Sequence, residues 1–156
     1  MAPLRVSSVV VVVFVLVFGV VATGAQAYVA HLSGGQAVPP VNTYAQGAAV
    51  FELSADGSVL SYRLVVNDVF NITRIQIRLC VNGDNGYPVA SLLGASGGSE
   101  MGAGVNARGF LTAADLQGPL AGQPLSALID SIQSGIAYVT VSTAANPPGE
   151  VRGQIR

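Results

Sequence analysis

IAYVTVSTAANPPGEVRGQIR, residues 136–156, is the stretch that decides the fold. Over residues 137–142, small apolar side chains alternate with tyrosine and hydroxyl side chains, which is the two-residue period of a β-strand. Residues 146–149 interrupt this pattern, because proline lacks a backbone donor and glycine accepts a positive φ. Alternation resumes over residues 150–155. The stretch therefore predicts a hairpin whose first strand has one buried face.

The same alternation recurs in short segments through the rest of the chain. It predicts strands over residues 28–32, 47–54, 59–67, 73–80, 87–93 and 105–111. Pro124, a helically spaced set of apolar residues and Gly135 predict one short helix near residues 124–134. Short strands, frequent turns and a single helix favour an all-β, antiparallel β-sandwich. A closed barrel is the alternative.

Residues 1–27 have the composition of a secretory signal peptide. Arg5 precedes an almost purely apolar run over residues 9–21, and Ala25-Gln26-Ala27 is a small-x-small cleavage pattern. The alternative is a transmembrane anchor, but the run is shorter than the roughly 20 residues that span a bilayer. We therefore expect cleavage after Ala27, secretion, and a mature domain of residues 28–156 without membrane attachment.

Charge and motifs argue against nucleic-acid binding and against catalysis. Loss of Arg5 would change the net charge from −1 to −2, and no basic patch indicates a nucleic-acid partner. His31 is the only histidine, and the residues near it do not indicate a Ser-His-Asp triad. No serine lies in a G-x-S-x-G context. We expect neither an enzyme nor a cofactor.

Two residues are candidates for covalent chemistry. Asn71-Ile72-Thr73 is an N-glycosylation sequon, which makes Asn71 a glycosylation candidate in a eukaryotic host, and the alternative is a chance match. Cys80 is the only cysteine, so an intrachain disulfide is excluded. Its free thiol is either shielded as a small apolar group or joins a second chain in a disulfide-linked homodimer.

Four stretches resemble the chordin-type (CHRD) domain family over nearly the whole mature chain. They are LSGGQAVPPVNTYAQGAAVFELSADGSVLSYRLVV (32–66), NITRIQIRLC with NGDNG (71–86), FLTAADLQGPL (110–120) and SGIAYVTVSTAANPPGEVRGQI (134–155). Their order and spacing carry the resemblance, and NPPGEVRGQI (146–155) is its most specific part. The resemblance implies a secreted, immunoglobulin-like β-sandwich, found in microbial proteins and in the animal chordin inhibitor of bone morphogenetic proteins. It implies no well-defined molecular function.

The resemblance also implies a metal site from which this chain departs. Microbial members commonly show His-x-His where this chain has Gln76-Ile77-Arg78, a third histidine where it has Ser142, and a glycine where it has Cys80. Glutamine and serine are poor transition-metal ligands, and the guanidinium of Arg78 repels a cation. We therefore expect the metal site to be lost.

These observations predict a secreted, non-catalytic module that binds an unidentified extracellular protein or glycan, or packs into a wall or matrix. The alternative is a metal-binding or redox-related extracellular protein. The expected binding surface is an exposed sheet face made of Arg74, Gln76, Arg78, Tyr138, Thr140 and Ser142.

Overall fold

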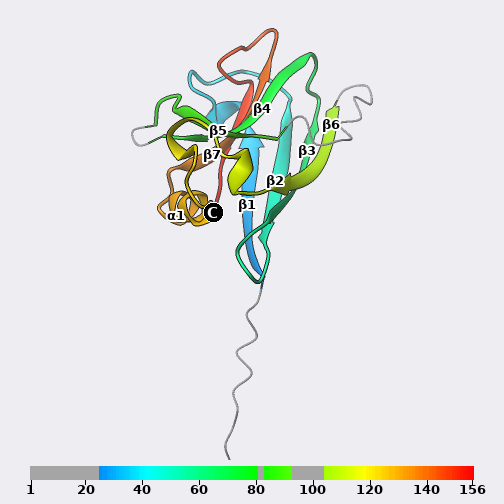
Figure 1. Cartoon of the computed structure of the whole chain (residues 1–156). Helices are drawn as coiled ribbons and strands as arrows, with labels where there is room; N and C mark the ends of the chain where they lie inside the picture. The colour runs from blue at the N-terminus through cyan, green and yellow to red at the C-terminus, as the bar shows by residue number, and fades with distance from the viewer. Residues whose placement is uncertain (1–24, 81–82, 93–103) are drawn as a thin grey trace, which may run out of the picture.

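The computed structural model describes residues 25–80, 83–92 and 104–156, which form an antiparallel β-fold with one helix (Figure 1). The strands are β1 (Gln26–Ser33), β2 (Gln46–Leu53), β3 (Leu60–Asn67), β4 (Ile72–Leu79), β5 (Tyr87–Ser91), β6 (Gly104–Leu111), β7 (Ala137–Thr143) and β8 (Val151–Gln154). The α-helix is α1 (Leu125–Gln133), and three single 3₁₀ turns are η1 (Gly34–Gln36), η2 (Ala113–Asp115) and η3 (Gly118–Leu120). No helix among the described residues is long and apolar enough to cross a membrane.

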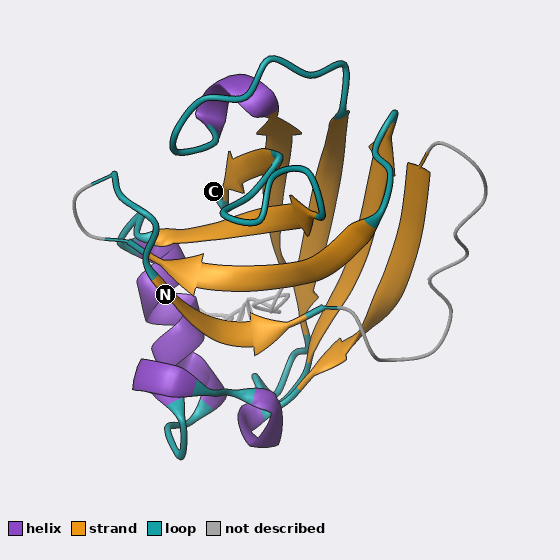
Figure 2. Ribbon diagram, turned by 90° about the horizontal axis from the view of Figure 1, so that it is seen from above, coloured by secondary structure: helices purple, strands orange, loops and turns teal. Residues whose placement is uncertain are grey.

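All eight strands belong to one sheet, in the order β5-β4-β7-β8-β1-β2-β3-β6. β1 pairs with β2 along its whole length, whereas it meets β8 at Ser33↔Arg152 and the residues after β8 at the bridge Ala30↔Ile155 and at Val29 and Arg156. The sheet bends at this junction, so that β4, β5 and β7 cross over β1, β2 and β3 (Figure 2). Gly153 permits the close approach, since a Cβ there would stand 2.4 Å from the His31 carbonyl oxygen.

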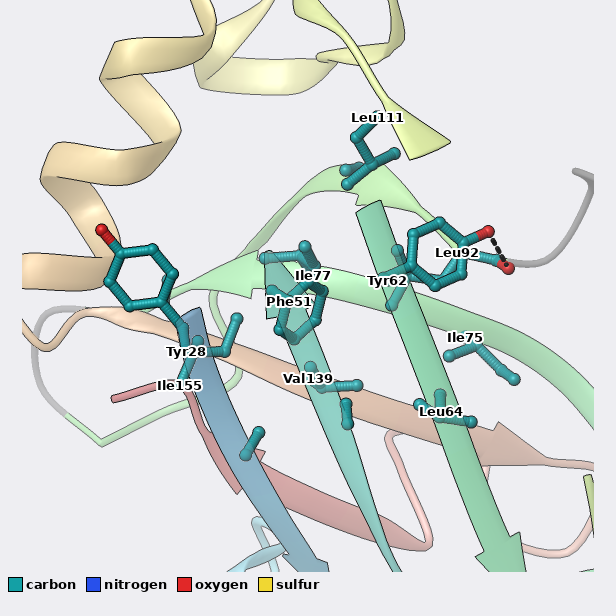
Figure 3. Close-up of a cluster of buried hydrophobic side chains, with 14 of the residues drawn as sticks. Tyr28, Phe51, Tyr62, Leu64, Ile75, Ile77, Leu92, Leu111, Val139 and Ile155 are labelled. Carbon is teal, nitrogen blue, oxygen red and sulfur yellow. Dashed lines mark hydrogen bonds between the residues drawn. The ribbon is translucent and has the colours of Figure 1, made fainter. Parts of the chain in front are cut away.

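The two halves of the bent sheet enclose the hydrophobic core (Figure 3). The largest buried side chains between them include Phe51, Leu64, Ile75 and Ile77. The hydroxyl of Tyr62 in β3 donates to the carbonyl oxygen of Leu92, just beyond β5, at 2.9 Å and so links the two ends of the sheet (Figure 3). Burial raises the pKa of Tyr62, and the negative charge of Asp115 adds to the effect.

Only one face of the helix packs its apolar side chains against the core. Leu125, Leu128, Ile129 and Ile132 are its buried apolar residues, at the spacing that places them on one side of a helix. The carboxamide of Gln133 donates to the hydroxyl of Tyr28 at 3.2 Å and so ties the end of α1 to β1. Gly135 then adopts a φ of 74°, the left-handed conformation expected of a glycine that ends a helix.

The structure confirms the antiparallel all-β class and the helix near residues 124–134. The strands form one continuous and nearly closed antiparallel sheet, because β1 bonds to β2 on one side and to β8 on the other. The finer description, an immunoglobulin-like sandwich, stays a prediction. Of the predicted leader, residues 1–24 lie outside the described part, whereas Gln26 and Ala27 already pair with β2.

Candidate functional site

The face predicted to bind a partner is largely covered. Tyr138, Thr140 and Ser142 are 0%, 2% and 0% exposed, so the prediction of an exposed surface is wrong for these three side chains. β7 is buried on both faces, not on one. The turn of residues 83–86, which precedes β5, folds over it, and the amide of Gly86 in that turn donates to the Tyr138 hydroxyl oxygen at 2.8 Å. Strand alternation does not reveal such a cover.

The polar side chains of β4 on this face hold the same turn. Nε of Arg78 donates to the carbonyl oxygen of Gly86 at 2.8 Å, and its Nη1 donates to Oε1 of Gln76 at 3.1 Å. Both side chains are half-buried. Arg74 is exposed at the start of the strand, where its Nη2 donates to the Pro147 carbonyl oxygen at 3.3 Å. Arg78 and Gln76 are therefore engaged within the protein.

Arg152 of β8 also binds the turn that covers Tyr138. Its guanidinium carbon lies 3.6 Å from the centroid of the Tyr138 ring, which is cation-π geometry. Its Nη1 donates to the Asp84 carbonyl oxygen at 3.1 Å, and the residue is only 9% exposed. Two arginines from different strands thus bind two carbonyl groups of one turn, and the turn seals the face beneath it.

Glu150 fastens a second cover on the same side of the molecule. Its carboxylate accepts hydrogen bonds from the hydroxyls of Thr43 and Thr143, both at 2.7 Å, and from the side-chain carboxamide of Asn146 at 3.4 Å. The loop before β2 is thereby tied to the β7–β8 turn. Glu150, Arg152 and Gly153, all from the NPPGEVRGQI motif, make contacts that build the fold.

The positions of the implied metal site do not suit a transition metal. Arg78 has a permanent positive charge at this position, and it donates a hydrogen bond to the carboxamide oxygen of Gln76. The hydroxyl oxygen of Ser142 is buried without a hydrogen-bond partner within the described part of the chain. Across residues 25–80, 83–92 and 104–156, no group of three or more His, Cys, Asp and Glu side chains could hold an ion.

The two candidates for covalent chemistry lie at opposite ends of β4. Cys80 is half-buried, with a free thiol and a backbone amide that donates to the Ile136 carbonyl oxygen at 2.9 Å. The disulfide-linked homodimer stays a prediction. Asn71 is exposed just before the strand, and its carbonyl oxygen accepts a hydrogen bond from the amide of Ala144 at 3.0 Å.

Sequence reasoning missed an open groove on the outer face of β2, β3 and β6. The groove has a volume of about 700 Å³. Across it, Val50 pairs with Arg63, and Arg63 pairs with Arg108. Phe110, 67% exposed, lies in the neighbouring row. The residues that line the groove are Val50, Glu52, Ser61, Tyr62, Arg63, Arg108, Gly109 and Phe110.

Arg63 and Arg108 are the unusual feature of this groove. Both are exposed and directly opposite each other on adjacent strands, and neither makes a hydrogen bond or ion pair with any residue that the structure describes. Like charges in this arrangement destabilise a sheet. The alternation of residues 59–67 and 105–111 already pointed both side chains outward, but it did not say that these two strands are neighbours.

The hairpin turn at one end of the groove is ordered by its own side chains. The hydroxyls of Ser54 and Ser58 both donate to Oδ1 of Asp56 at 2.7 Å. These bonds, with the backbone amide of Ser58, lower the pKa of Asp56 to about 2. Gly57 follows with a φ of 73°, as expected for an Asp-Gly turn.

Comparison with known proteins places the chain in a family. A family model described as the CHRD domain matches residues 28–155. No match was found among curated proteins or among solved structures. The matched region contains all eight strands except the first two residues of β1, and it includes the Glu150 and Arg152 contacts. The chain therefore belongs to the CHRD domain family.

Proposed function

We propose that this chain is a secreted, non-catalytic extracellular module that binds an acidic polysaccharide along the outer face of β2, β3 and β6. The observation that carries the proposal is the pair Arg63 and Arg108, two guanidinium groups that have no polar partner among the described residues and lie opposite each other in an open groove. The immunoglobulin-like description and the extracellular location that the family resemblance implied are part of this proposal.

The charge arrangement favours an anionic ligand. Two guanidinium groups on facing strands repel each other, and a carboxylate or sulfate between them converts that repulsion into charge-assisted hydrogen bonds. Arginine suits this role because its planar donors match the two oxygens of a carboxylate. Glu52, also in the groove, repels an anion at its own position and so restricts where along the face the acidic groups lie.

The apolar part of the groove favours a sugar chain. Phe110 and Val50, 67% and 38% exposed, present apolar surface beside the two arginines. A pyranose ring has an apolar face of C–H groups and a polar rim, which suits a surface that places an aromatic ring next to cations. The groove is open along the sheet, so it suits an extended polymer better than an enclosed small molecule.

Two further observations support an extracellular and non-catalytic role. The family match begins at residue 28, directly after the leader predicted over residues 1–27. The most specific family motif is used in contacts that hold loops and strands together, through Glu150 and Arg152. These contacts therefore have a structural role.

The experiment measures binding of the secreted chain to polygalacturonate and to its fully methyl-esterified form, which has the same backbone without the charge. We expect binding to the polyacid only, weaker as salt rises, and reduced about tenfold or more for each arginine lost in Arg63→Ala and Arg108→Ala. Arg74→Ala is the matched control, because it removes an exposed arginine outside the groove.

Three outcomes would overturn the proposal. They are undiminished binding by the double variant Arg63→Ala/Arg108→Ala, equal binding to the methyl ester, and tighter binding to polyglutamate than to the polyuronate. The last outcome would assign the groove to an acidic protein segment.

A further inference from the structure

A second exposed surface lies at the β3–β4 turn, outside the Arg63–Arg108 groove, and the inference drawn from it shares with the proposed function only the premise that the chain is secreted. Tyr44 is 91% exposed and Phe70 is 59% exposed, although both are large and apolar. They line a groove of about 550 Å³ together with Asn42, Thr43, Asp68 and Glu150. Two exposed rings that line one groove with a polar rim have the character of an interaction site, unlike apolar residues scattered singly over a surface.

The groove is held in shape from below. Glu150 accepts the hydroxyl of Thr43 at 2.7 Å, and Thr43 in turn accepts the Ala45 amide at 3.1 Å. This fixes the backbone on either side of Tyr44. The β3–β4 turn is fixed as well, because the Asn71 carbonyl oxygen accepts the Ala144 amide at 3.0 Å.

The glycosylation sequon borders this groove. Phe70 directly precedes Asn71, and the side chains of Asn71 and Thr73 are both exposed and make no hydrogen bond with any described residue. Asn71 has a φ of 51°, a left-handed conformation that asparagine tolerates better than most residues. The acceptor amide is therefore held at the surface on an ordered turn.

We propose that Asn71 carries an N-linked glycan whose first sugars pack on Phe70 and Tyr44. A sugar ring matches this groove because its C–H face stacks on aromatic rings while its hydroxyls reach the polar groups of Asn42 and Asp68. A purely apolar partner would leave the carboxylate of Asp68 buried without a partner, which is costly.

The attachment is a group transfer that needs a donor. Nδ2 of Asn71 attacks C1 of the reducing-end sugar of an oligosaccharide bound to a lipid diphosphate. The C1–N bond forms, the bond between C1 and the phosphate oxygen breaks, and the lipid diphosphate leaves with the bonding electron pair. One amide proton passes to a base of the transferase, and nothing is oxidised or reduced.

The first test measures occupancy in the full chain secreted from a eukaryotic cell, by intact mass before and after release of N-glycans. Thr73→Ala is the preferred variant, because a change at Asn71 itself would strain the left-handed turn. We expect the glycan on the wild-type chain and on Thr73→Ser, and its loss in Thr73→Ala. An unglycosylated wild-type chain would overturn the proposal.

The second test asks whether the glycan packs on the protein. Complete enzymatic removal should lower the Tm of the wild-type chain by about 2–4 °C, whereas trimming to the first sugar should leave it nearly unchanged. In Phe70→Ser the shift on removal should disappear. Tyr87→Ser, which changes an aromatic residue 73% exposed and outside the groove, should keep it. An equal shift in Phe70→Ser and the wild type would overturn the packing.

Discussion

Two pairs of arginines on one sheet differ in their surroundings, because one pair is engaged within the protein and the other is exposed. Arg78 and Arg152 are drawn into the protein, where they bind the carbonyl oxygens of Gly86 and Asp84. Arg63 and Arg108 line an open groove and make no hydrogen bond or ion pair with any described residue. All four lie in strands at positions that alternate with apolar residues, so the local pattern does not separate them. The loops that cross the sheet make the difference.

The covered face lies over β7 and β8, which have strands on both sides and the turns around residues 83–86 and 146–150 above them. The open face lies over β2, β3 and β6, at an edge of the sheet. A guanidinium under a cover needs fixed acceptors, because burying an unpaired charge is costly. A guanidinium in the open keeps its hydration and is available to a ligand.

The strongest test of the cover is Tyr138→Ala. This change removes a fully buried ring that packs under Arg152 and accepts a hydrogen bond from Gly86. We expect the free energy of unfolding to fall by about 3–5 kcal/mol, as for other buried aromatic truncations. Urea denaturation measures it. The matched change Tyr87→Ala, at a residue 73% exposed, should alter stability by no more than about 0.5 kcal/mol.

The two kinds of arginine are compared directly by methionine substitution, which retains an unbranched apolar chain. Arg152→Met loses the cation-π contact and the bond to Asp84, so we expect a fall of about 2 kcal/mol in unfolding free energy. Arg63→Met breaks no hydrogen bond or ion pair with a described residue and should change the unfolding free energy by about 0.5 kcal/mol or less. Equal losses in the two variants would remove the distinction between the faces.

A charge reversal should have a small effect of opposite sign. In Arg108→Glu a carboxylate stands across from Arg63, so an attractive pair replaces a repulsive one. We expect the free energy of unfolding to rise by about 0.5 kcal/mol at low salt and the gain to shrink as salt is added. The same variant should lose binding to polygalacturonate. Destabilisation by this change would show that Arg108 has a structural role.

The smallest expected effect concerns the turn beside the open face. The pKa of Asp56 is lowered to about 2 from 3.8, so its folded state favours the carboxylate. The resulting stability is present above pH 3.8 and is lost as the pH falls toward 2. Wild type and Asp56→Ala should therefore differ at neutral pH and converge near pH 2, as measured by urea titrations. A pH-independent difference would contradict this cause.

Sequence patterns located the strands and the helix well, because alternation and turn residues are local properties. The candidate site was harder to predict. Tyr138 and Ser142 alternate with apolar residues and so read as exposed, yet turns remote in sequence bury them. The open groove was missed because β3 and β6 are not consecutive in the chain. Its signal, an outward arginine in each strand, becomes meaningful only once the two strands are paired.

The amino-acid sequence alone determined the β-class, the hairpin over residues 136–156 and, through the motif that ends at Ile155, the family. The class and the hairpin depend on residues close together along the chain, and the family depends on the order and spacing of sequence motifs. Tertiary structure alone decided that the strands form one bent sheet, that Arg152 is buried and that Arg63 meets Arg108. The physical reason is that exposure and charge pairing depend on which distant segments fold over or beside a strand, and strand periodicity contains no information about that.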